Sequence, residues 1–106
     1  AGALFENFVI SELLKKEQHQ GSNAEHYFLR TSDKKEIDLI IDRKISKSFI
    51  EIKKTKTFKT SYTDTVKQFM TENDQGFLLY QGSDYPYLDN LKVLNIGEYL
   101  LSGEPD

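Results

Sequence analysis

Apolar residues change between helical and strand-like spacing along the chain, and this change predicts a mixed order of helices and strands. Near the start, Leu4, Phe5, Phe8, Val9 and Leu13 recur at the spacing of one stripe of an amphipathic helix. Shorter apolar runs follow, separated by polar turn residues. The predicted elements are a helix at 3–18, strands at 26–31, 36–42 and 48–53, a helix at 61–72, strands at 76–80 and 92–96, and a helical turn at 97–101.

The order of these elements predicts how the sheet is built and covered. Short connections between the first three strands favour an antiparallel meander. The continuous apolar run 76–80 is typical of a central parallel strand, and a helix precedes it, which implies a right-handed crossover. Helices on both faces would cover such a sheet. We therefore expect an α/β fold, a three-layer α-β-α sandwich with a mixed central sheet.

Composition narrows the class of protein. The 106 residues suffice for a single domain at 1–106, and 38% hydrophobic and 29% charged residues are ordinary for a globular chain. The absence of cysteine excludes a disulfide framework, a thiolate zinc site, an iron–sulfur cluster and a cysteine nucleophile. No apolar run approaches the roughly 18 residues of a membrane span, and no signal-peptide pattern opens the chain. These features predict a cytoplasmic protein with no membrane partner.

Charge is distributed unevenly along the chain. The net charge of -3 argues against a general nucleic-acid binder. The segment 43–67 nevertheless carries eight basic and two acidic side chains. This segment is either a solvated lysine-rich loop or a surface for phosphate groups. In the second case we expect phosphate contacts from Lys54, Lys56 and Lys59, and stacking of Tyr62 on a base, although the Tyr62 ring could instead pack in the core. Outside this segment, Arg30 is a further candidate for contact with a phosphate group.

Two neighbouring strands predict a cluster of charged side chains. On the second strand, alternation puts Asp38 and Ile40 on one face and Ile37 on the other. On the third strand, Glu51 and Lys53 share a face and lie about 7 Å apart along the strand. If the two strands pair, the carboxylates of Asp38 and Glu51 converge, with Lys53 beside them.

Such a cluster points to metal-dependent chemistry. An acidic side chain with apolar neighbours is costly unless it is paired or binds a metal. Two converging carboxylates suit Mg²⁺ or Mn²⁺, which take oxygen ligands and leave positions for water. A metal held there can polarise a phosphodiester, and Lys53 can neutralise charge that develops on the phosphate. Asp38, Glu51 and Lys53 are therefore the predicted catalytic residues, with Asp38 and Glu51 as metal ligands.

The spacing of these residues resembles the PD-(D/E)XK nuclease superfamily. Its signature is an acid on one strand and an acid-x-lysine on the next, matched here by Asp38 and Glu51-Ile52-Lys53. The resemblance implies a restriction-endonuclease-like core: helix, three-strand meander, helix, strand and short strand. It also implies a glutamate on the first helix that helps to hold the metal, and Glu6 matches that place. Ile37 stands directly before Asp38, where the family's name has a proline, and this departure makes the match less specific.

A second resemblance covers nearly the whole chain. The runs 2–13, 27–31, 36–40, 76–80 and 93–100 look like an uncharacterised domain that forms the C-terminal part of many prokaryotic AAA-type ATPases. The resemblance implies that the 106 residues are a C-terminal fragment of a longer ATPase and that the ATPase domain is their partner. They contain no Gly-x-x-x-x-Gly-Lys-Ser/Thr motif, so they cannot hydrolyse ATP through that loop.

Two classes of function fit these residues. One is a metal-dependent nuclease-like domain that hydrolyses phosphodiester bonds of DNA or RNA and is appended to an AAA-type ATPase. The other is a catalytically inactive module on the same fold that binds nucleic acid or protein and regulates the ATPase, which agrees with the net negative charge. Enzymatic activity is a hypothesis at this stage, and the sequence leaves open the choice between DNA and RNA and the oligomeric state.

Overall fold

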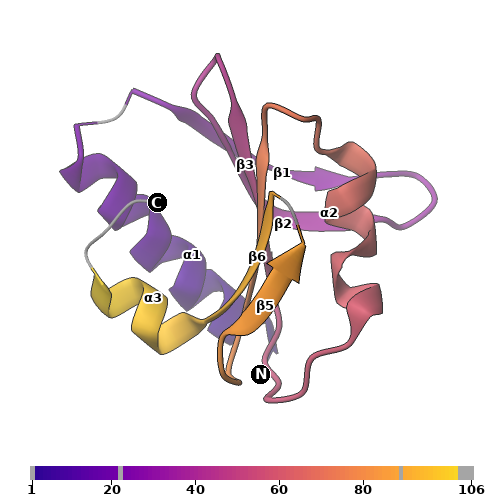
Figure 1. The fold of residues 1–106 in the computed structure, drawn as a ribbon. Helices are drawn as coiled ribbons and strands as arrows, with labels where there is room; N and C mark the ends of the chain where they lie inside the picture. The colour runs from indigo at the N-terminus through magenta and orange to yellow at the C-terminus, as the bar shows by residue number, and fades with distance from the viewer. Residues whose placement is uncertain (1, 22, 89, 103–106) are drawn as a thin grey trace.

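Helices lie on both faces of a mixed sheet in the computed structural model, which describes residues 2–21, 23–88 and 90–102 (Figure 1). The elements are α1 (Gly2–His19), β1 (Glu25–Arg30), β2 (Glu36–Asp42), β3 (Lys47–Ile52), the 3-10 turn η1 (Thr60–Thr63), α2 (Asp64–Phe69), β4 (Gln75–Tyr80), β5 (Tyr85–Leu88), β6 (Leu91–Asn95) and α3 (Ile96–Ser102). α1 and α3 cover one face and α2 the other. The predicted α/β class is confirmed.

The sheet has the strand order β1-β2-β3-β4-β6-β5 in the described part of the chain. β1, β2 and β3 form the predicted antiparallel meander. β4 is central and parallel to both β3 and β6, as its continuous apolar run predicts. β5 pairs antiparallel with β6 at the edge, in a segment for which no helix or strand was predicted. Pro86 lies within β5, and proline is tolerated at a sheet edge because one side of such a strand needs no donors.

The second helix is shorter than the predicted 61–72. η1 and α2 together end at Phe69, and Met70 already has an extended backbone with φ -78 and ψ 149. The Asp74 carboxylate accepts hydrogen bonds from the Thr71 N–H at 2.8 Å and from the Lys47 N–H at 2.9 Å. Asp74 therefore holds the chain in a turn that leads into β4 next to β3, and this turn replaces the last helical residues.

The apolar stripe of α1 is narrower than predicted. Val9 and Leu13 are buried against the sheet, whereas Leu4 is 75% exposed and Phe8 60% exposed. Leu4 and Phe8 lie roughly 100–140° around the helix from Val9, so they face outward instead of toward the sheet. None of the described helices has the length and apolar character that crossing a membrane requires.

Candidate functional site

β2 contains a bulge at the position of Asp38. Tyr27 of β1 pairs with Ile40 and Leu29 pairs with Ile37, so two steps along β1 span three steps along β2. A bulge of this kind inserts one residue and redirects the side chains around it. Ile37 and Ile40 consequently pack in the same core cluster beneath α2. The prediction from strict alternation, which put Ile37 and Ile40 on opposite faces, was wrong for this reason.

The bulge directs the Asp38 carboxylate into the space between β2 and β3. The ladder between these strands ends at the pair Leu39–Ile50. Beyond it, Asp38 Oδ2 accepts a hydrogen bond of 2.8 Å from the Ile52 N–H. A side-chain oxygen thus takes the place of a main-chain carbonyl, and this bond fixes the carboxylate beside β3. The expected convergence of Asp38 with Glu51 follows from this local geometry.

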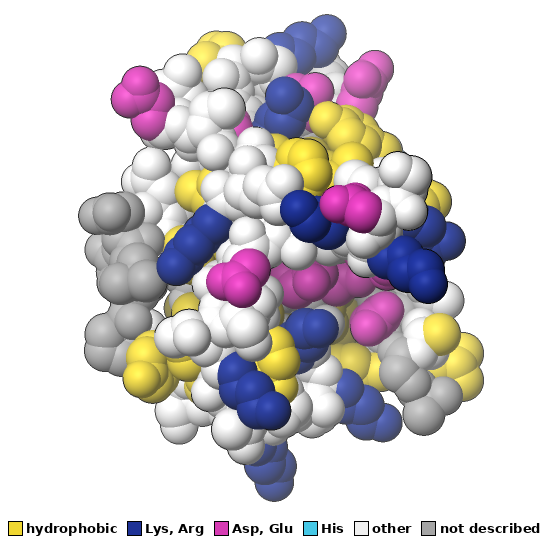
Figure 2. Space-filling view, turned by 90° about the vertical axis from the view of Figure 1, so that its right-hand side faces the viewer, with side chains coloured by type: hydrophobic (Ala, Val, Ile, Leu, Met, Phe, Trp, Pro, Cys, Tyr) yellow, Lys and Arg dark blue, Asp and Glu magenta, His cyan; other side chains and the backbone are white. Residues whose placement is uncertain are grey.

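Asp38, Glu51 and Lys53 line one open pocket of about 320 Å³. Its walls are formed by residues of α1, α2, β2, β3 and the turn between β1 and β2. Figure 2 looks onto the face that carries α2 and shows acidic side chains at the floor of a hollow, with lysine and arginine side chains around it. The pocket is lined by Glu6, Lys34, Lys35, Glu36, Asp38, Glu51, Ile52, Lys53 and Thr65.

The environment of Glu51 opposes its negative charge. Its Oε1 atom is buried and has no hydrogen-bond partner. Burial, followed by the hydrogen bond with Asp38 and the charge of Asp38, raises the pKa of Glu51 from 4.5 to about 9, against the opposite effect of Lys53. Burial and the neighbouring Asp38 therefore favour the neutral form of Glu51 when no cation is bound.

Lys53 and Glu6 stand beside this pair. The Lys53 N–H donates to the Leu79 carbonyl at 2.9 Å, which fixes its backbone against β4. Its Nζ lies 5.2 Å from the centroid of the Tyr62 ring. Glu6, on α1, is half-buried, and burial followed by the charge of Asp38 raises its pKa while Lys53 lowers it. The lysine is thus close enough to act electrostatically on both Glu6 and Glu51.

The floor of the pocket suits a hard cation. The buried Glu51 Oε1 is an oxygen without a partner, and the second oxygen of Asp38 is not used by the bond to Ile52. Among the described residues, no three His, Cys, Asp or Glu side chains are grouped to hold a metal ion. The protein would therefore contribute chiefly two carboxylates and leave other positions to water, as Mg²⁺ commonly requires. Direct ligation by Glu6 stays a prediction.

The lysines predicted to bind nucleic acid are not among the residues that line this pocket. Lys54 turns toward α1, where its Nζ lies 5.7 Å from the centroid of the Phe5 ring. Lys56 and Lys59 are exposed on the segment between β3 and η1. Lys54, Lys56 and Lys59 do not line the pocket. Their contact with nucleic acid stays a prediction.

The other two predicted nucleic-acid contacts have partners within the protein. Tyr62 is half-buried and packs against the core cluster of Leu78, Tyr80 and Val93, which matches the core-packing alternative. Arg30 lies on the edge strand β1, with its Nε 3.5 Å from a Glu36 carboxylate oxygen. Base stacking by Tyr62 would require its ring to leave this packing.

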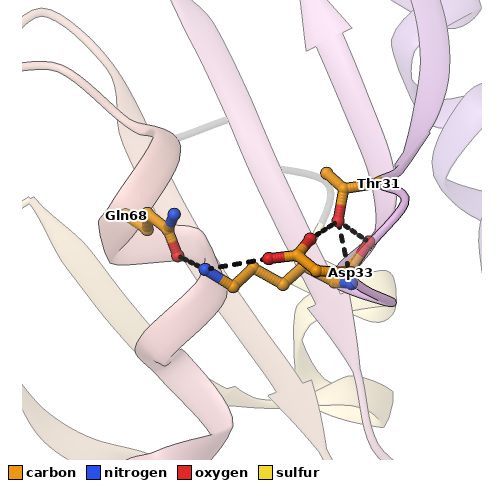
Figure 3. A network of polar contacts seen from close by, with 4 residues as sticks. Thr31, Asp33 and Gln68 are labelled. Atoms are coloured by element: carbon orange, nitrogen blue, oxygen red, sulfur yellow. Dashed lines mark hydrogen bonds and ion pairs between the residues drawn. The ribbon is translucent and has the colours of Figure 1, made fainter.

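The turn between β1 and β2 was not among the predicted site residues, yet it supplies Lys34 and Lys35 to the pocket. Figure 3 shows how this turn is tied to α2. Lys35 Nζ donates a hydrogen bond of 2.7 Å to Gln68 Oε1 and lies 3.7 Å from an Asp33 carboxylate oxygen. The Thr31 hydroxyl donates to Asp33 in turn. These contacts tie the turn to α2 beside the pocket.

The position of Asp38 contained a signal for these lysines. Asp38 lies two residues after the start of β2 at Glu36, so the turn that precedes β2 has to lie at the same end of the sheet. No comparable pattern in the sequence indicates that Thr65 of α2 lines the pocket, because its position depends on how α2 packs across the sheet.

Substitutions of Asp38 should separate its structural bond from its charge. We expect Asp38→Ala to lower the free energy of unfolding of the metal-free protein by about 1–2 kcal/mol, because the buried Ile52 N–H loses its acceptor. Asp38→Asn should cost less, since its amide oxygen can still accept that bond. Urea denaturation in the presence of EDTA measures both. Equal losses in the two variants would contradict this role for the hydrogen bond.

One comparison with known proteins finds a match. The model of the family described as a domain of unknown function (DUF4143) matches residues 1–99. No curated protein and no solved structure matches the chain significantly.

Proposed function

The chain belongs to the DUF4143 family, and we propose that it is a metal-dependent nuclease-like domain that hydrolyses phosphodiester bonds of DNA or RNA. The observation that carries the proposal is Glu51, whose buried oxygen has no hydrogen-bond partner and whose carboxyl group faces Asp38 on the floor of an open pocket. Paired carboxyl groups with a buried, unpartnered oxygen are characteristic of functional sites, and a cation can satisfy them. Lys53 beside them adds the group that phosphoryl chemistry needs.

Each residue then has a distinct role. Asp38 and Glu51 would hold Mg²⁺ or Mn²⁺, which supplies a Lewis acid for the phosphodiester when bound. The bond from the Ile52 N–H keeps the Asp38 carboxylate in place without using its second oxygen. Lys53 places a positive charge where negative charge develops on the phosphate. Glu6, on the wall formed by α1, would bind the metal or one of its waters.

The arrangement of strands supports a restriction-endonuclease-like core and a PD-(D/E)XK site. α1 precedes the antiparallel meander, and α2 connects β3 to the parallel β4. Asp38 and the motif Glu51-Ile52-Lys53 lie on adjacent strands at the same end of the sheet. The family match fits a domain associated with AAA-type ATPases, and we propose such an ATPase domain, in a longer chain, as its partner.

Titration calorimetry and a cleavage assay together test the proposal. Mg²⁺ and Mn²⁺ should bind to the wild type at one site and bind at least tenfold more weakly to Asp38→Asn. Asp42→Asn is the matched control, because Asp42 is also on β2 and accepts a main-chain hydrogen bond, from Lys44 at 2.8 Å, outside the pocket. End-labelled DNA and RNA should be cleaved by the wild type with either metal. Absence of metal binding, or binding that Asp38→Asn leaves unchanged, would overturn the proposal.

A second candidate is an inactive module that binds nucleic acid. The observation in its favour is that the described residues offer no group of three potential metal ligands, while a shared proton alone can satisfy the pair Asp38–Glu51. This candidate predicts that DNA and RNA stay intact with either metal. It also predicts binding that weakens steeply with salt.

A further inference from the structure

Lys34 occupies a distinctive place at the mouth of the pocket. It lies at the tip of the turn between β1 and β2, where its N–H closes the turn on the Thr31 carbonyl at 3.0 Å. Its side chain is exposed, lines the pocket and makes no hydrogen bond or ion pair with any other described residue. The ammonium group is therefore free to meet a ligand that enters the pocket.

The charges next to Lys34 are already paired within the protein. Lys35 is held by Gln68 and Asp33. Asp33 also accepts the Thr31 hydroxyl group, and this hydrogen bond, together with Lys35, lowers the pKa of Asp33. Glu36, the next residue on this wall, is paired with Arg30. Lys34 thus carries a positive charge that none of these neighbouring side chains neutralises.

The pocket also has a second lysine on a different wall. Lys53 comes from the end of β3 and lies over the Tyr62 ring, next to the acidic floor. Lys34 comes from the turn, and the contact of Lys35 with Gln68 of α2 fixes that turn. Two lysines on separate walls are suited to two phosphate groups, whereas a single phosphate at the acidic floor would need only Lys53.

We propose that Lys34 binds a phosphate group of the substrate other than the one that is hydrolysed. The substrate class is accordingly a polynucleotide strand, which presents phosphates in series, and not a lone phosphomonoester. This inference rests on the proposed function, because the strand is placed by a scissile phosphate at Asp38 and Glu51. Lys34 recognises the charge of the backbone, so the contact is independent of base sequence.

The salt dependence of binding tests the inference. The probe is a short fluorescently labelled single-stranded DNA, and anisotropy is read in Mg²⁺ during a time in which a gel shows the DNA intact. Lys34→Gln should weaken binding about threefold to tenfold and reduce the slope of log K against log salt by about 0.7, the value for one phosphate contact on a single strand. A slope equal to that of the wild type would overturn the inference, and so would absence of binding by the wild type.

Two further variants separate charge from structure. Lys44→Gln is the matched control, because Lys44 also sits in a turn with a positive φ, 79° against 69° for Lys34, but lies outside the pocket. It should leave affinity and slope unchanged. Gln68→Ala frees Lys35 without removing a charge, and it should also keep the slope of the wild type. A slope reduced equally in Gln68→Ala would contradict a direct contact by Lys34.

Cleavage assays on the same proteins distinguish failure of the proposed nuclease activity from failure of the proposed Lys34 contact. Wild-type protein that binds DNA with a slope dependent on Lys34 but cleaves nothing would overturn the nuclease and keep the phosphate contact. Wild-type protein that cleaves DNA while Lys34→Gln binds and cleaves equally well would overturn only the role of Lys34.

Discussion

Replacing Lys53 by methionine is expected to reduce the kcat of phosphodiester cleavage by about 100-fold or more, the usual effect of removing one group that stabilises charge in a transition state. Methionine keeps an unbranched apolar side chain of nearly the same length, and it removes the charge that lies 5.2 Å from the centroid of the Tyr62 ring. Affinity for Mg²⁺ should stay the same or become tighter, because a positive charge next to the metal ligands is lost. Single-turnover cleavage and calorimetry measure the two effects separately.

Lys54→Met is the appropriate control for this variant. Lys54 is the next residue, but its ammonium group lies over Phe5 of α1 and not in the pocket. With substrate at saturating concentration, we expect its single-turnover cleavage rate to stay within about twofold of the wild type, because a contact with a phosphate that is not hydrolysed changes affinity and not the rate of the chemical step. Equal rates for wild type, Lys53→Met and Lys54→Met would remove Lys53 from the site.

The sequence predicts the central part of the candidate site because Glu51 lies on a regular strand and Lys53 directly follows it. β3 follows strict alternation, so residues two apart share a face. Asp38 was expected to converge with Glu51 for the same reason, yet the bulge in β2 breaks the alternation there. The Asp38 side chain points away from Leu39 both in a regular strand and in the bulge, so the expectation for Asp38 agrees with the structure. For Ile37 the two geometries differ, and there the expectation from alternation was wrong.

The remaining features depend on contacts between segments far apart in the sequence. Lys35 meets Gln68 across 33 positions of the chain, and no local pattern in either segment indicates this contact. The basic segment 43–67 has the composition of a phosphate-binding surface, but the turns of the backbone send Lys54 toward α1 and leave Lys56 and Lys59 outside the pocket. A count of basic residues along this segment therefore overestimates how many of them lie together at the pocket.

Raising the pH is expected to destabilise the metal-free protein between about pH 5 and pH 9. The pKa of Glu51 is raised from 4.5 to about 9 in the folded protein, chiefly by burial and by Asp38. Across this window the folded protein keeps a proton that the unfolded chain has released. Folding then takes up a proton, and the free energy of unfolding falls as the pH rises, then levels off above about pH 9.

Glu51→Gln isolates this effect, because glutamine is neutral at every pH and can still donate a hydrogen bond to Asp38. Urea denaturation in EDTA should show a decline of at most about 1.4 kcal/mol per pH unit for the wild type between pH 5 and pH 9, and a much flatter profile for Glu51→Gln. Burial and Asp38 also raise the pKa of Glu6, so Glu6 adds a smaller decline of the same sign in both proteins. Asp33 and Asp74, with lowered pKa values, affect stability only at more acidic pH.

Added Mg²⁺ should reverse the trend in the wild type alone. A metal ion at Asp38 and Glu51 displaces the proton of Glu51, so its binding releases a proton and strengthens as the pH rises. Stabilisation by a fixed concentration of Mg²⁺ should therefore be greatest near pH 9, where the metal-free protein is weakest, and small in Glu51→Gln. A wild-type profile that stays flat in EDTA would show that Glu51 is ionised in the folded protein. A Mg²⁺ effect that is equal in both proteins would place the metal elsewhere.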